Sequence, residues 1–224
     1  MYDRARGGGA TRMGTRRMDP VRSKTALLYS TVRRALQSGR YVPGERIDPA
    51  SLAHEFHMSP TPVRCALYRL AGEGVIVDHP RHGFQVPLPT ELSLRDLYGW
   101  MEQLLVMACT SPARKASEHA SARATVSDDV PKRTWKLFDA IARSSGQWSL
   151  HEAVRRTNDR LAPIRRATLE LMIDMPEELD RLQQLFVAHD LQRLEHALRD
   201  YHAHRRQLVP QIVALLAERR DRLH

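Results

Sequence analysis

One amphipathic segment sets the architecture of the N-terminal part of this chain: Ser59-Pro-Thr-Pro-Val-Arg64-Cys-Ala-Leu-Tyr68-Arg-Leu70. Its apolar side chains recur at helical spacing, at Val63, Leu67 and Leu70, so one face of a helix can pack on a core. The other face carries hydroxyl, guanidinium and phenol groups and no carboxylate. Such groups form hydrogen bonds with phosphates and base edges. The segment therefore predicts a DNA-recognition helix whose reading face consists of Thr61, Arg64, Cys65 and Tyr68.

Two prolines indicate where this helix begins. With Ser59 as the N-cap, Pro60 and Pro62 take the first and third helical positions, where backbone N–H groups have no intrahelical acceptor. Because Pro62 has no N–H, we expect the Ser59 hydroxyl to cap the helix through Thr61 alone.

The segments upstream complete a helix-turn-helix. Residues 48–56 predict a shorter helix with an apolar face, and His57-Met58 form a tight connector to the recognition helix. Residues 24–37 predict a first helix that ends at Gly39.

Downstream, the short β-rich runs 74–77 and 84–86 flank a turn that contains proline and glycine. This pattern predicts a hairpin. Arg81 and His82 fall at its tip, where a wing touches the DNA backbone or the minor groove. Together with the three helices, the hairpin makes a winged helix.

Three stretches resemble the DNA-binding domain of GntR-family bacterial transcription regulators. They are the turn after the first helix, the recognition helix and the wing, at residues 38–45, 59–67 and 81–86. The resemblance covers residues 24–88. It implies that operator DNA is contacted by Ser59, Thr61, Arg64, His82 and Gly83.

Two positions depart from the family pattern. Pro60 stands where many members have a basic residue, and Ala50 stands where some have an arginine. We therefore do not carry over the base readout of those members.

Positive charge is concentrated towards the N-terminus of this chain of 224 residues, whose net charge is +9. Residues 1–24 carry seven basic and two acidic side chains, residues 25–90 seven and five, and the remainder twenty-one and nineteen. This asymmetry favours a nucleic-acid partner for the N-terminal end.

Residues 1–23 contain three successive glycines and show no hydrophobic periodicity, which predicts a disordered basic arm. Two interpretations of the arm stay open. Either its arginines, Arg16 and Arg17 among them, follow the phosphate backbone or enter the minor groove, or the arm is a solvated leader that only raises solubility.

No apolar run is long enough to span a membrane, and the charged N-terminus lacks the apolar region of a signal peptide. We therefore expect a cytoplasmic, nucleoid-associated protein without membrane contact. The two cysteines, Cys65 and Cys109, agree with this location. We expect them to be unrelated small residues rather than a redox sensor.

After a short proline-containing linker, residues 90–220 show helical periodicity without strand alternation. We expect an all-α bundle that serves as the effector and dimerisation domain. Residues 110–133 are expected to be partly helix and partly loop. A long final helix is predicted to carry Leu191, Leu194, Leu198, Leu208, Ile212 and Leu215. The fold class is thus mainly α, a winged helix-turn-helix of three helices and a small β-hairpin wing followed by an all-α helical bundle.

The second domain resembles in part that of the FadR-like (FCD) subfamily, whose bundle binds a carboxylic acid, often through a metal held by an aspartate and histidines. Asn158 with Leu161, and Asp190 followed by His202, match parts of its pattern. Other positions of that pattern hold residues that are poor metal ligands, or lack the subfamily's arginine: Ser145, Ser149, Leu179 and Met101.

We therefore predict no metal and no other cofactor. His202 and His204 lie two residues apart and point to different sides of a helix, so we expect solvated histidines or histidines at the edge of the core. For His151 and Glu152 we favour an exposed helix surface over a displaced ligand pair.

No pattern of a nucleophile with a base, a cofactor loop or paired catalytic carboxylates occurs in the chain, so we do not expect an enzyme. The expected partner is double-stranded operator DNA, bound at a pseudo-palindromic site by a homodimeric repressor. Control by a small-molecule effector is left open. The alternative is a DNA-bound architectural or partner-recruiting protein whose helical domain only oligomerises.

Overall fold

The computed structural model describes residues 20–110, 129–171 and 175–222. These residues form a mainly helical protein with a two-stranded antiparallel sheet, which confirms the predicted fold class. Their buried apolar side chains gather in two hydrophobic clusters, one in the winged helix and one in the helical bundle.

Three helices and a hairpin build the winged helix. Asp48 caps the second helix by accepting the backbone N–H groups of Ala50 and Ser51 at 3.3 and 2.8 Å. The first helix begins at Pro20, within the segment predicted to be an arm, because the fixed φ of proline suits the first helical position. The elements are α1 (Pro20–Ser38), α2 (Pro49–Glu55), α3 (Pro60–Gly72), β1 (Val77–His79) and β2 (Gly83–Gln85).

The first strand of the wing begins later than predicted. Val75 and Ile76 are buried in the winged-helix core, and the Val75 N–H donates to the Leu70 carbonyl at the end of α3 at 3.1 Å, so strand pairing starts at Val77, opposite Gln85. The other edge of β2 is covered by residues 44–47, whose Ile47 N–H donates to the Phe84 carbonyl at 2.8 Å.

The second part of the chain is a helical bundle, as predicted. Its first helix, α4 (Glu91–Thr110), lies against α8 and α6 and buries Leu94, Met101 and Leu105 completely. None of the helices that the structure describes has the length and apolar character needed to cross a membrane. The remaining elements are α5 (Val130–Ser144), α6 (Trp148–Ala167), the 3-10 helix η2 (Leu169–Leu171), α7 (Met175–Val187), α8 (Leu191–Gln207) and α9 (Val209–Asp221).

The predicted long final helix is wrong, because the chain divides there into α8 and α9 at Leu208. Pro210 has no N–H to donate to the carbonyl of Arg206, four residues earlier. Arg95 of α4 donates to that carbonyl instead, at 2.8 Å. In α9 the predicted Ile212 is buried, whereas the predicted Leu215 is only partly buried and its neighbour Leu216 is buried instead.

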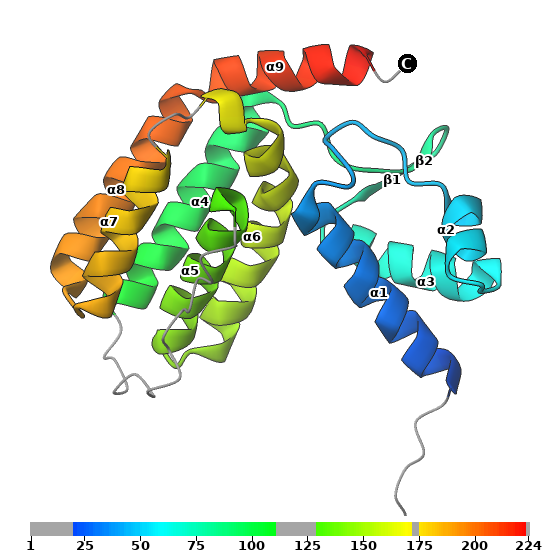
Figure 1. The fold of residues 1–224 in the computed structure, drawn as a ribbon, viewed down its shortest axis with the longest axis horizontal. Helices are drawn as coiled ribbons and strands as arrows, with labels where there is room; N and C mark the ends of the chain where they lie inside the picture. The colour runs from blue at the N-terminus through cyan, green and yellow to red at the C-terminus, as the bar shows by residue number, and fades with distance from the viewer. Residues whose placement is uncertain (1–19, 111–128, 172–174, 223–224) are drawn as a thin grey trace, which may run out of the picture.

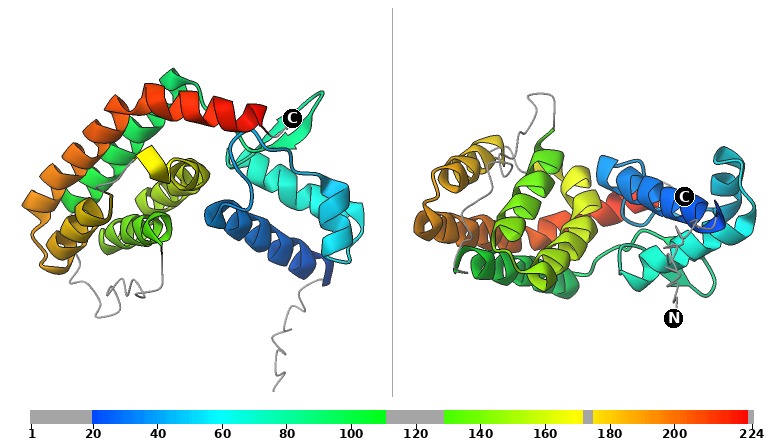
Figure 2. Two further views of the ribbon diagram at one scale, coloured as in Figure 1. Left: turned by 45° about the horizontal axis from the view of Figure 1, so that its top comes forward. Right: turned by 90° about the horizontal axis from the view of Figure 1, so that it is seen from below.

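The winged helix and the bundle meet where α1 packs on α6, and α9 runs across the top of the bundle towards the winged helix (Figures 1 and 2). Arg166 of α6 donates to the carbonyl of Gln37 at 3.3 Å. Gly39 lies beneath the same arginine with a φ of +81°, and a Cβ there would overlap the Arg166 side chain. A glycine is therefore required at this junction.

Candidate nucleic-acid interface

Helix α3 presents its predicted reading face to solvent. Arg64 has no ion-pair partner among the residues that the structure describes. Arg69, one turn further on, contacts Glu73 at 3.3 Å and lies over the Tyr29 ring at 4.0 Å, so it serves the fold. The exposed face consists of Ser59, Thr61, Arg64, Cys65 and Tyr68, and the buried face of Val63, Ala66, Leu67 and Leu70.

The N-terminus of α3 differs from the prediction in one hydrogen bond. Ser59 takes the N-cap position with extended backbone, φ −71° and ψ 157°, but its side chain makes no capping hydrogen bond. The expected cap through Thr61 is therefore wrong. The uncapped hydroxyl and the Thr61 N–H stay available to an anion at this helix N-terminus.

The wing stands beside α3. The ring of Tyr68 meets that of Phe84 in β2 edge-on, with centroids 5.1 Å apart, while Tyr68 remains 56% exposed. Arg81 and His82 are exposed in the turn between the strands, and Gly83 ends this turn with a φ of +67°. The ring contact therefore holds the hairpin next to the reading face of the helix.

A further cation, Arg46, joins this surface without having been among the predicted site residues. It forms a β-bridge with Gln85, and its guanidinium comes within 4.0 Å of the place that a Cβ on Gly83 would take. The pattern of residues near Arg46 gives no sign of this, because the bridge joins segments that are distant in sequence.

Three arginines of this region are exposed and have no ion-pair partner in the described parts of the chain: Arg46, Arg64 and Arg81. We call them the free arginines. Arg40 differs, because its guanidinium is held by both carboxylate oxygens of Glu55 at 2.7 and 2.5 Å. The predicted arm residues Arg16 and Arg17 lie outside the described residues.

In the helical domain, the positions compared with the metal site hold side chains engaged in other contacts. The Ser145 hydroxyl is buried and donates to the Ala142 carbonyl at 2.7 Å. Leu179 and Met101 belong to the apolar core, and Ser149 is exposed. Within the described ranges no three His, Cys, Asp or Glu side chains gather in a metal-binding group. The prediction of a metal-free domain stays a prediction.

The expectation that His202 is solvated or lies at the edge of the core is wrong, because its side chain is completely buried. Its Nδ1 lies 2.7 Å from the Leu198 carbonyl, which places the ring proton on Nδ1. Burial, together with the positive charges of Arg165 and Arg205, lowers the pKa of His202 to about 3. His204, by contrast, is partly exposed and contacts Glu178 at 3.3 Å.

His151 belongs to a local network rather than to a ligand pair. Its Nε2 lies 2.8 Å from Oδ1 of Asp139, a buried carboxylate that also accepts from Arg143. The prediction that His151 lies on an exposed helix surface holds only in part, because its side chain is only 20% exposed.

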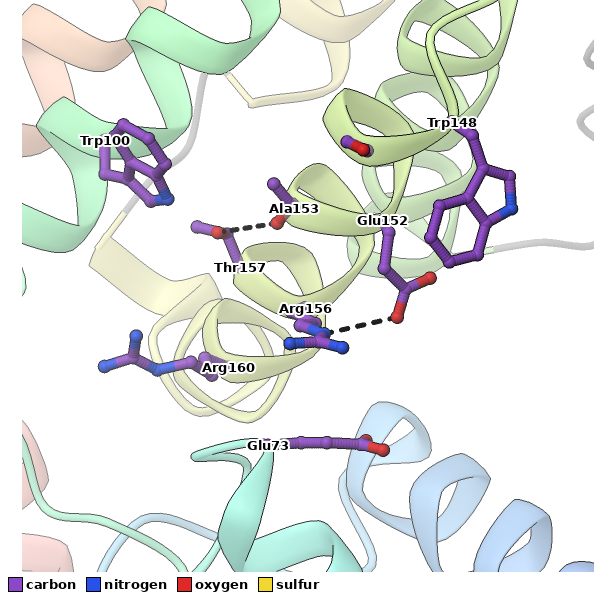
Figure 3. Close-up of a pocket in the computed structure, with 9 residues that line it drawn as sticks. Glu73, Trp100, Trp148, Glu152, Ala153, Arg156, Thr157 and Arg160 are labelled. Carbon is purple, nitrogen blue, oxygen red and sulfur yellow. Dashed lines mark hydrogen bonds and ion pairs between the residues drawn. The ribbon is translucent and has the colours of Figure 1, made fainter.

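A hollow of about 380 Å³ lies between the end of α3 and α6 (Figure 3). Glu73 faces it from α3, where it accepts the Tyr29 hydroxyl at 2.6 Å. On α6, Arg156 donates to Glu152 at 3.2 Å. We assign no ligand to the hollow, whose Glu73 and Arg156 already have partners.

Comparison with known proteins identifies the first part of the chain. Residues 24–86 match the model of the bacterial regulatory proteins of the gntR family. An HTH-type transcriptional regulator of Bacillus subtilis (strain 168), YdhC, is 30% identical over 70 residues, which are 31% of this chain and 31% of that protein. The chain thus matches about a third of the length of this curated relative.

Two solved structures share the fold along most of the chain. E. coli McbR/YncC has a TM-score of 0.66 at 20% identity and covers 84% of this chain and 97% of its own. A putative transcriptional regulator GntR from Rhodococcus sp. RHA1 has a TM-score of 0.67 at 17% identity and covers 84% and 98%. At these identities the likeness shows the order and packing of the elements, the helical domain included.

Proposed function

The chain carries a GntR-family helix-turn-helix domain in residues 24–86, and from this premise we propose that it is a sequence-specific DNA-binding transcription regulator. We further propose that it acts in the cytoplasm, on the nucleoid, as a homodimeric repressor of a pseudo-palindromic operator. Residues 24–88 would form the DNA-binding unit, and residues 90–220 the effector and dimerisation unit.

One observation carries the proposal, namely that hydrogen-bond donors without side-chain partners among the described residues gather around α3 and the wing. The free arginines supply three guanidinium groups, and Ser59 and Tyr68 add hydroxyls. Arginine suits phosphate and the edge of guanine because its planar group donates two parallel hydrogen bonds. We therefore propose that α3 enters the major groove and that Arg81 and Arg46 contact the phosphate backbone.

A homodimer is supported by an exposed apolar stripe on α4. Leu92, Trp100 and Met107 are 72%, 46% and 45% exposed, and their spacing keeps them on one side of the helix. Large apolar side chains that are grouped in the open favour association. Two copies related by a two-fold axis would place two recognition helices on successive major grooves, which explains the proposed pseudo-palindrome.

Small-molecule control is favoured over an oligomerisation-only role by the interior of the helical domain. Arg165 and Arg205 are buried there, beside the neutral His202, although a domain that only oligomerises needs no buried charge. We propose that an effector bound at these residues changes the affinity of the dimer for its operator.

Selection of DNA by the full chain tests the function. The protein is incubated with a random duplex library, the bound fraction is sequenced, and the enriched duplex is compared with a shuffled duplex by fluorescence anisotropy at fixed salt. We expect two inverted half-sites about 10 base pairs apart and at least roughly 1,000-fold tighter binding than to the shuffled duplex. Equal affinity for both duplexes would contradict sequence-specific regulation.

A further inference from the structure

The surroundings of Arg165 and Arg205, in the middle of the helical domain, hold more positive than negative charge. Arg165 of α6 and Arg205 of α8 are each 2% exposed. Arg205 Nη1 contacts Glu178 at 2.6 Å, whereas Arg165 Nη1 donates to the neutral side chain of Asn158 at 2.6 Å. Among the described residues Arg165 has no carboxylate partner, so of the two buried guanidiniums Arg205 alone meets a carboxylate, that of Glu178.

Both arginines leave the same edge without a partner. In each, Nε and Nη2 are buried and make no hydrogen bond with the described residues. The Nε–H and the outer Nη2–H of a guanidinium point the same way, as a fork that matches two oxygens of one anion. The domain therefore contains two buried guanidinium edges whose Nε and Nη2 donors make no hydrogen bond with the described residues, with the Tyr201 side chain close to that of Arg165.

Two further buried atoms lack partners among the described residues, the Tyr98 hydroxyl of α4 and Nε2 of His202. Because the His202 proton lies on Nδ1 towards Leu198, its Nε2 is a lone pair that accepts a hydrogen bond. A ligand that satisfies this group needs acceptor oxygens for the forks and one O–H donor for His202.

Ring contacts show that Arg165, His202 and Arg205 belong to one cluster, and the charges of both arginines act on the buried Tyr98 hydroxyl. The Arg205 guanidinium lies 3.4 Å from the Tyr201 ring, and the Tyr201 and His202 rings are 5.0 Å apart. His202 stacks on Phe138 at 5.7 Å, and the Arg165 guanidinium lies 5.2 Å from the same Phe138 ring. Side chains from α5, α6 and α8 therefore converge in the middle of the bundle.

The excess charge needs a partner, because a guanidinium does not lose its proton in a protein. Burying a charge without a counter-charge has a large unfavourable free energy. Burial lowers the pKa of Arg165, which expresses the same penalty. A bound anion would relieve it.

We propose that Arg165, Arg205, His202 and Tyr98 bind a phosphoryl group, as phosphate or a phosphate monoester, without a metal. A tetrahedral oxyanion offers oxygen pairs in several directions and can meet two forks at once, whereas a planar carboxylate matches one. Its protonated oxygen donates to Nε2 of His202, and its negative charge balances the excess guanidinium. The site rests on the effector part of the proposed function and deepens it.

Binding is measured on the full chain in the absence of DNA, by calorimetry and thermal unfolding at constant ionic strength. The probes are inorganic phosphate and glycerol 3-phosphate, with sulfate and malate as comparators. We expect saturable binding of both phosphates, with a rise in Tm of about 5 to 10 °C at concentrations about 100-fold above Kd. No phosphate-dependent shift, or a larger shift with malate than with phosphate, would overturn the proposal.

Two variants separate binding from folding. Arg165→Met removes one fork and the excess charge, so it should abolish the phosphate response while its ligand-free Tm is equal to or above that of the parent. Should this variant not fold, Arg165→Gln serves, with an expected loss of affinity of roughly 10- to 100-fold. Arg193→Met, at an exposed arginine of α8, is the matched control and should respond to phosphate like the parent.

His202→Asn tests the proton donor of the ligand. Its amide keeps a donor towards the Leu198 carbonyl but removes the Nε2 acceptor, so phosphate affinity should fall roughly tenfold while sulfate affinity stays the same. Equal losses for both ions would overturn the role of His202. These titrations contain no DNA, so a negative result speaks against the phosphate site alone. The library selection tests the proposed DNA-binding function separately.

Discussion

The Arg33 guanidinium of α1 and the Asp159 carboxylate of α6 form a buried ion pair across the junction of the winged helix and the bundle. Arg33 Nε donates to Oδ2 at 2.6 Å, Gln37 donates to Oδ1 at 2.7 Å, and the Trp135 indole N–H donates to the same oxygen at 2.9 Å. Burial raises the pKa of Asp159 and the charge of Arg33 opposes that shift. The Asp159 carboxylate thus connects α1 of the winged helix with α5 and α6 of the bundle.

Replacing Asp159 by asparagine should loosen this junction. Arg33 is 16% exposed and would lose its counter-charge there, and breaking one side of a buried pair costs about 3 kcal/mol. Urea unfolding should show a lower free energy of unfolding for Asp159→Asn. Glu170→Gln breaks an exposed pair with Arg219 and should cost less than about 1 kcal/mol. Equal effects of the two changes would contradict the importance of the junction.

Arg64 should carry much of the sequence preference of α3. Arg64→Ala removes the free guanidinium at the centre of the reading face, and operator binding should weaken by about 1 to 3 kcal/mol. Anisotropy titration with the selected operator measures the change. Arg193→Ala, at an exposed arginine of α8, provides the control and should bind as the parent does. Unchanged operator affinity of a folded Arg64→Ala protein would rule out this assignment.

The wing arginine Arg81 and its neighbour Arg46 should contribute charge rather than specificity. Each replacement by alanine should weaken binding to operator and shuffled DNA alike. It should also lower the slope of log affinity against log salt by about 0.9 for each phosphate that the variant no longer neutralises. Titrations at several salt concentrations give the slope. A weakening confined to the operator would show that these side chains read bases instead.

The stripe on α4 should hold the dimer together. In the double variant Trp100→Glu with Met107→Glu, two like charges would face each other across the two-fold axis, so sedimentation of the full chain should show a monomer. Operator affinity should then fall about a hundredfold, because a bound monomer no longer holds a second recognition helix near the other half-site. Val187→Glu, at a 64% exposed apolar residue of α7, should leave the mass unchanged. A dimeric double variant would locate the interface elsewhere.

His202 should make stability depend on pH. Its pKa is lowered to about 3 in the folded protein, from an ordinary value of 6.5, so the unfolded chain binds a proton that the folded chain does not. Stability is therefore complete above pH 6.5 and decreases as the pH falls towards 3, by up to about 1.4 kcal/mol per pH unit. In phosphate-free buffer, the decline should be shallower for His202→Asn than for the parent. An equal decline of the two proteins would contradict this role of His202.

Local patterns in the sequence determined the winged helix. The period of Val63, Leu67 and Leu70 separates a core face from an exposed face whatever the rest of the chain does, and all three side chains are buried. Even so, the Ser59 hydroxyl makes no cap, and Val75 and Ile76 delay the first strand. The same helical period indicated the bundle, but it could not locate the break before α9, where Arg95 satisfies the carbonyl that Pro210 leaves free.

Tertiary structure alone decided which charges are buried, paired or free. The sequence shows thirty-five lysines and arginines without distinguishing Arg33, which meets a carboxylate 126 positions away, from Arg165, which meets none among the described residues. It likewise gives no sign that Arg46 reaches the wing. A helix pattern depends on residues three and four apart, whereas the state of a charge depends on which distant side chains exclude water from it.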